Sequence, residues 1–92
     1  MAIQQTTLTR NWIQLGTGVT NCFVNNISGA MIEIMGLPNA VMPSVTDHGW
    51  KIKPGTPGET FALDELGFEA NLTVLWARSA DKIDGVIRFE IG

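Results

Sequence analysis

The chain has 92 residues, a net charge of −3 at neutral pH and a pI of about 4.8. Its six Lys and Arg residues are scattered singly, which excludes the basic patch that binding to DNA or RNA requires. No run of about 18 apolar residues and no basic start followed by an apolar segment is visible, so we expect no membrane span, no membrane partner and no secretory export.

The composition is that of one domain with a weakly charged surface. Hydrophobic residues make up 45% of the chain and charged residues only 16%, against about 25% charged residues in an average soluble domain. Such a surface suits a subunit that its neighbours cover in an assembly, although a soluble domain with a neutral surface has the same composition.

Short strand-favouring runs alternate with Gly, Pro and Asn turns at intervals of roughly 8–12 residues, and no amphipathic helix is evident. The pattern predicts an all-β fold: a single small antiparallel β-sandwich of about seven short strands, jelly-roll or Ig-like, over residues 10–92. The polar segment 1–9 is expected to form an N-terminal arm that lies on a neighbour or on its own sheet. The expected strands are 10–15, 20–24, 31–35, 49–53, 59–64, 72–79 and 86–91.

The run Leu72–Ser79 is the most strand-like stretch and has apolar residues on both faces. We expect Trp76 in the core, and Thr73, Leu75 and Ala77 under a neighbouring subunit or under a long loop. In the strand 31–35, Glu33 is expected to mark the wetter face.

That long loop is Gly36–His48, which lacks a regular period, contains two prolines and carries several apolar side chains. We expect it to contact a partner together with the arm; the alternative is that it folds back over an open end of the core. The predicted interaction surface comprises Ile3, Leu8, Leu37, Val41, Met42, Val45 and Leu75.

Residues that could carry catalysis are isolated. His48 is the one histidine and has no nucleophile at a recognisable spacing, so a solvent-facing or capping role is expected, with a pH-sensitive contact as the alternative. Cys22 lies in a strand-like run, where a buried apolar role is expected, and it has no Cys or His companion for a zinc site. We therefore expect a protein that is not an enzyme.

The acidic residues do not form a recognisable metal site. The pairs Asp64/Glu65 and Asp81/Asp84 have no motif that supports calcium binding or cleavage of a glycosidic bond, and the spacing of Asp81 and Asp84 lacks the alternating oxygen ligands of a calcium loop, so solvated turn-forming acids are expected. The Gly-Pro segment Lys53–Gly58 lacks the Lys-Ser/Thr of a phosphate loop, and its Pro54-Gly55 pair instead predicts a type II turn. We expect no cofactor and no metal.

The three tryptophans allow one further interpretation. Trp12 and Trp50 would form a platform for sugar rings if they were exposed together, whereas core packing is the alternative for both.

Six pieces follow one another over roughly residues 12–92: an Asn-rich turn with Gly, an Ile-Glu strand, a loop, a Pro-Gly turn, a Phe-x-Leu strand and a Leu-Trp-Ala strand. These pieces are Asn25–Gly29, Met31–Ile34, Gly36–His48, Pro54-Gly55, Phe61–Leu63 and Leu75–Ala77. This order of turns and strands resembles the small all-β virion proteins of tailed bacteriophages.

The resemblance implies a structural protein of the virion, assembled in the host cytoplasm. The function that this resemblance implies first is that of a capsid decoration (cement) protein, which binds the outer head surface, stabilises the shell and forms a homo-oligomer on the particle. The implied partner is the major capsid protein or another virion protein. The alternative is a tail- or fibre-associated sandwich, including a carbohydrate-binding module for host attachment.

Overall fold

The computed structural model describes residues 3–44, 46–67 and 71–92. Within these residues the chain forms eight strands and one short 3-10 helix, η1. No helix of the described residues is long and apolar enough to cross a membrane. The elements are β1 (Gln4–Leu8), β2 (Ile13–Gly16), β3 (Asn21–Asn26), β4 (Ile32–Leu37), β5 (Trp50–Ile52), β6 (Glu59–Ala62), η1 (Leu63–Leu66), β7 (Val74–Ser79) and β8 (Gly85–Ile91).

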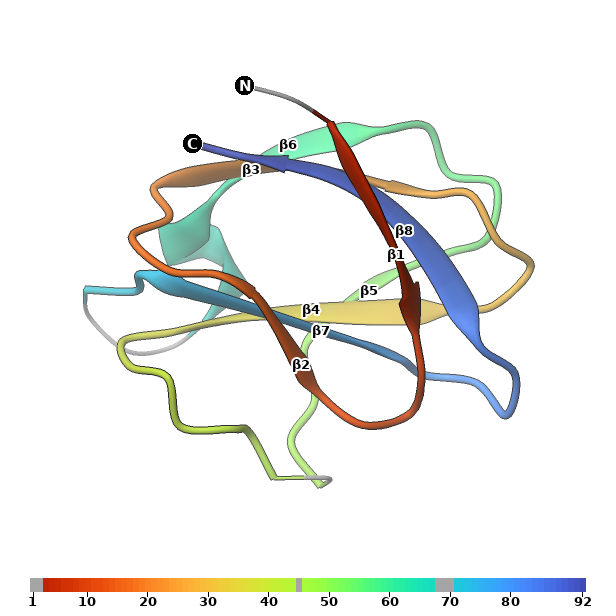
Figure 1. The fold of residues 1–92 in the computed structure, drawn as a ribbon, viewed down its shortest axis with the longest axis horizontal. Coiled ribbons are helices and arrows are strands. Elements are labelled where there is room, and N and C mark those ends of the chain that lie inside the picture. The colour runs from red at the N-terminus through yellow and green to blue at the C-terminus, as the bar shows by residue number, and fades with distance from the viewer. Residues whose placement is uncertain (1–2, 45, 68–70) are drawn as a thin grey trace.

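The strands form two four-stranded antiparallel sheets that pack as a sandwich (Figure 1). We call the sheet with order β1-β8-β3-β6 the first sheet and the sheet with order β2-β7-β4-β5 the second sheet. Strand β1 pairs with β8, β2 with β7, β3 with β6 and β4 with β5, which is the pattern of one long hairpin rolled up on itself. This arrangement is a jelly roll rather than an Ig-like sandwich. The prediction of an all-β sandwich is confirmed, with eight strands instead of about seven.

The additional strand comes from the segment expected to be an arm. Residues Gln4–Leu8 pair without interruption with Gly85–Phe89 of β8, and Leu8 is fully buried between the sheets. The polar residues before Leu8 are tolerated because β1 lies at the edge of the first sheet. Residues 4–8 therefore lie on the chain's own sheet, one of the two placements expected for this segment.

Local signals explain two of the turns. Gly55 has φ of 71° and the Thr56 amide donates to the Lys53 carbonyl at 3.3 Å, as the predicted Pro54-Gly55 type II turn requires. After β3, the buried Asn26 side chain donates to the carbonyls of Ala30 and Ile52 at 2.6 and 3.0 Å, which ties the following turn to β5.

Strand β7 is buried along its whole length, as the two-sided apolar pattern predicts. The side chains on its two faces, however, point in the directions opposite to those predicted. Leu75 and Ala77 point into the core between the sheets, whereas Val74 and Trp76 pack in a second cluster with Trp12 on the outer face of the second sheet. Trp76 is buried as expected, but Leu75 belongs to the central core and cannot contact a partner. Thr73, expected to be covered, is exposed.

We predict that Leu75→Ala lowers the free energy of unfolding by about 2–5 kcal/mol, because it leaves a cavity at the centre of the sandwich. The matched control Thr73→Ala, two residues earlier and exposed, should change it by no more than about 0.5 kcal/mol. Urea denaturation followed by circular dichroism measures both. A Leu75→Ala protein as stable as the parent would contradict the inward orientation of Leu75.

Candidate functional site

The outer face of the second sheet carries a buried ion pair. Glu33 of β4 and Arg78 of β7 lie directly opposite one another in the antiparallel register. The Arg78 Nε atom donates to Glu33 Oε1 at 3.2 Å, and Arg78 Nη2 lies 3.2 Å from the same oxygen. Their side chains are only 3% and 8% exposed. The prediction that Glu33 marks the more solvent-exposed face was therefore wrong, because a loop of the chain covers this face.

That cover is the loop between β4 and β5, residues 38–49. Its Asp47 carbonyl accepts a hydrogen bond of 2.7 Å from Arg78 Nη2. Its Gly49 amide donates to Glu33 Oε2 at 2.8 Å. Gly49 has no room for a Cβ atom, which would meet the Ile34 carbonyl and the Trp12 ring. The ion pair thus fixes the end of the loop against the sheet.

Trp12 fixes the middle of the loop. Its indole Nε1 donates to the Ser44 carbonyl at 3.1 Å, and the Arg78 guanidinium lies 4.4 Å from the centre of its ring. The Ser44 amide in turn donates to Asp47 Oδ2 at 2.7 Å, which closes a tight turn within the loop. Because its ring is buried under these contacts, Trp12 is not available to stack on a sugar.

Among its described residues, the anchored loop presents two large apolar side chains to solvent. Val41 and Met42 are 68% and 60% exposed, although Pro43 beside them is buried. Figure 1 shows the loop projecting from one side of the sandwich, after the end of β4. We call Val41 and Met42 the loop tip.

The other members of the predicted interaction surface lie in different environments. Ile3 is exposed and precedes β1 in the first sheet, while Leu37 is half-buried against the Trp12 cluster. Leu8 and Leu75 are fully buried core residues, so their assignment to a contact surface is corrected. Val45 lies outside the described residues.

Three hollows meet at His48 beside the loop. One of about 370 Å³ is lined by Arg10, Lys51 and Arg78 with Glu33. A second, of about 340 Å³, lies between the loop and η1, and a third, of about 180 Å³, is lined by Trp50 and Glu65. His48 itself is largely exposed, with Nδ1 3.9 Å from Glu33 Oε2.

Trp50 keeps the exposure that a sugar platform needs. Its side chain is 53% exposed, and its ring contacts Phe61 edge-on, with the ring centres 5.9 Å apart. Because Trp50 and Phe61 come from β5 and β6, they close the seam between the edges of the two sheets. Of the two tryptophans proposed for sugar stacking, only Trp50 is exposed.

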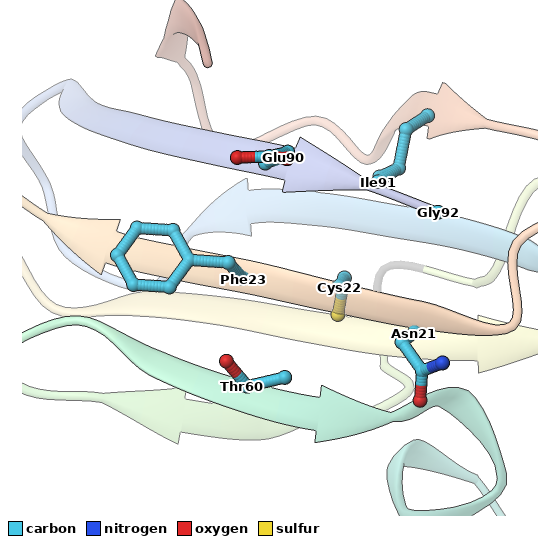
Figure 2. A pocket seen from close by; sticks show the side chains of 7 residues that line it. All are labelled: Asn21, Cys22, Phe23, Thr60, Glu90, Ile91 and Gly92. Carbon is cyan, nitrogen blue, oxygen red and sulfur yellow. The ribbon is translucent and has the colours of Figure 1, made fainter. Parts of the chain in front are cut away.

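A further hollow, of about 370 Å³, lies between β3, β6 and β8 beside Cys22 (Figure 2). Burial raises the pKa of the Cys22 thiol to about 11, and a hydrogen bond with the backbone of Phe61 opposes this shift. The thiol is therefore protonated at neutral pH and a poor nucleophile.

The acidic pairs serve local structure. Asp81 Oδ2 accepts the Met31 amide at 2.7 Å, and Glu65 Oε1 accepts the Ala62 amide at 3.1 Å. No group of three or more His, Cys, Asp or Glu side chains among the described residues is arranged to hold a metal ion.

Comparison with models of protein families, with curated proteins and with solved structures gave no match. The resemblance to virion proteins therefore depends on the sequence pattern alone, and any argument for function depends on the surface described above.

We predict that Arg78→Met lowers the free energy of unfolding by about 3–5 kcal/mol, because it leaves Glu33 buried without a counter-charge. The double variant Glu33→Leu/Arg78→Met should recover part of this loss, since no charge then stays buried, although the Gly49 amide and the Asp47 carbonyl lose their side-chain partners. Arg88→Met is the matched control, because Arg88 is an exposed strand arginine on the first sheet. Urea denaturation measures all three variants; equal stability of Arg78→Met and Arg88→Met would refute a structural role for the pair.

Proposed function

We propose that the chain is a structural protein of a tailed-bacteriophage virion, a capsid decoration (cement) protein that binds the outer head surface and stabilises the shell. The observation that carries this proposal is the loop tip, an exposed apolar pair on a loop that a buried ion pair holds in place. Residues Val41 and Met42 are the contact residues in this proposal.

The anchored loop suits docking for a physical reason. Ordering a mobile loop on binding costs free energy, and a loop already fixed by Glu33, Arg78 and Trp12 avoids much of that cost. Two exposed apolar side chains on such a support can be buried against a partner with most of their hydrophobic gain retained.

Two further features agree with a subunit of a shell. The jelly roll recurs in viral capsid and lectin domains, although a fold alone does not define a function. The low charged fraction of 16% leaves a neutral surface that neighbours can cover. A protein that binds only the assembled lattice stabilises it by mass action, and many weak sites on one shell act together.

We predict that Val41→Ser/Met42→Ser weakens binding to purified heads by about 2 kcal/mol or more, a factor of about 30 in affinity. Ile83→Ser is the control, because Ile83 is equally exposed but lies in the β7–β8 connection, at the other end of β4 from the loop. Occupancy is measured by sedimenting particles with each purified variant and quantifying the bound chain. Equal occupancy of the double variant and the parent, or absence of the chain from purified virions, would contradict the proposal.

A carbohydrate-binding module on a tail or fibre is the second candidate. The observation that favours it is Trp50, an exposed ring held by Phe61 beside a hollow that also contains His48 and Glu65. An aromatic face next to polar groups is the usual arrangement for a sugar ring.

We predict for this candidate that Trp50→Ala abolishes binding to any glycan that the parent retains on a glycan array, with fluorescence titration as the quantitative measurement. The loop-tip double variant is the reciprocal control and should keep the sugar affinity of the parent. Binding to no glycan, or binding that survives Trp50→Ala, would remove this candidate, while particle occupancy unaffected by Trp50→Ala would favour the first.

A further inference from the structure

Four strands form the edges of the two sheets, and three of them carry features that oppose pairing with another chain. Strand β2 is interrupted by a register shift between Gln14 and Gly16. Strand β5 has only three residues, with the exposed Lys51 at its centre. Strand β6 begins at the exposed Glu59, just after Pro57 and Gly58. Bulges, short length, charges and proline are the known means of protecting an edge.

The fourth edge, β1, has none of these protections. Its sequence Gln-Gln-Thr-Thr-Leu contains no charge and no proline, and at five residues it is the longest of the four edge strands. Its register with β8 is continuous from Gln4 to Leu8.

The register also shows which backbone groups of β1 point outward. The Ile27 amide donates to the Val86 carbonyl at 3.2 Å, so the backbone of Val86 faces β3, and that of Ile87 faces β1. Ile87 is the partner of Thr6 in the register. The backbone N–H and C=O groups of Thr6 and Gln4 therefore point toward β8. The alternation then directs the backbone N–H and C=O groups of Gln5 and Thr7 away from the sheet.

We infer that β1 pairs antiparallel with β1 of a second copy of this chain, in a register centred on Gln5 opposite Gln5. This pairing places Ile3 of each copy opposite Thr7 of the other and joins the two first sheets into one continuous sheet of eight strands. The inference goes beyond the proposed function, because it concerns the purified chain and holds whatever partner the loop tip binds.

A second copy fits this edge better than a charged strand from another protein. In the Gln5-centred register every opposed pair is uncharged: Gln5 with Gln5, Ile3 with Thr7, and Gln4 with Thr6. Ile3, exposed in the monomer, gains cover from the Thr7 methyl group. The nearest like charges are the two Arg88 side chains, three strand spacings or about 14 Å apart, which is beyond the Debye length at physiological salt.

The first experiment traps this register. Residues in a hydrogen-bonded antiparallel pair have Cα atoms about 5.5 Å apart, within the range that a disulfide spans. Gln5→Cys should therefore form a covalent dimer under mild oxidation, visible on a non-reducing gel. Thr60→Cys, an exposed position on the opposite edge strand of the same sheet, is the matched control and should stay monomeric, as should the parent with its buried Cys22.

The second experiment tests the same register with charged substitutions at Gln5 and forms no covalent bond. Gln5→Lys and Gln5→Glu each place like charges opposite one another across the pairing, while Arg88, the partner of residue 5 in β8, adds to the repulsion of the lysines and offsets part of that of the glutamates. Gln5→Lys alone should therefore lose the concentration-dependent dimer expected for the parent in sedimentation, and Gln5→Glu alone should weaken it. An equimolar mixture of the two should recover a dimer, since the charges are then opposite. Circular dichroism verifies that both variants fold, because Gln5 is exposed.

The inference is overturned if the parent stays monomeric and Gln5→Cys forms no more dimer than Thr60→Cys. It is also overturned if a dimer persists unchanged in Gln5→Lys, which would place the contact on another surface. Neither result would bear on binding to heads by the loop tip, which is measured on particles with its own variants.

Discussion

The buried ion pair between Glu33 and Arg78 is the constraint on which the covered outer face of the second sheet depends. Taking two charges out of water costs several kcal/mol for each ion unless hydrogen bonds compensate. Strands β4 and β7 supply the two charges, and the loop supplies a carbonyl from Asp47 and an amide from Gly49. If the loop left the sheet, Glu33 and Arg78 would lose these hydrogen bonds and the free energy of unfolding would fall. The position of the loop is therefore coupled to the stability of the sandwich.

This coupling suits an irregular loop to the binding role proposed for it. The side chains that fix it, Trp12 and Arg78, lie under it, while Val41 and Met42 point outward. A loop held only by its own turns would have to order itself when a partner binds. Here hydrogen bonds to Ser44, Asp47 and Gly49 already hold the loop against the sheet, so a partner of the proposed kind would meet a preformed surface with Val41 and Met42 exposed.

Much of the architecture could be predicted from the sequence, because turn chemistry and alternation are local. Pro54-Gly55 forms the expected turn, and β7 is covered on both faces as its composition requires. An Asp-Gly pair is a common signal for a tight hairpin turn, and Asp84-Gly85 shows the limit of such signals. Gly85 begins β8 instead of completing a tight turn, and a Cβ there would lie 2.8 Å from the Ile32 side chain. A glycine is needed at position 85 because β8 packs closely against Ile32 there, and no local sequence pattern reveals such a contact.

The candidate site was predicted less completely, for a related reason. An alternation of period two assigns residues to two faces but cannot say which face is inside when both are apolar, so Leu75 was assigned to the surface and Trp76 to the central core. The pairing of Glu33 with Arg78 spans 45 positions in the sequence and depends on the register of β4 against β7. The available signal was the charge of Glu33 in an otherwise apolar strand. The sequence alone does not identify Arg78 as the residue that pairs with it.

The jelly roll separates the two surfaces that these arguments identify. The loop tip lies on the connection between β4 and β5 of the second sheet, whereas the unprotected edge β1 belongs to the first sheet. Pairing through β1 therefore leaves both loop tips uncovered, and each dimer presents two of them. Two weak contacts held on one rigid sheet bind a repeating lattice with greater avidity than either alone, provided that their spacing matches the lattice. An unprotected, uncharged edge strand and an anchored loop would then act as parts of one binding device, with the sandwich fixing the distance between the two tips.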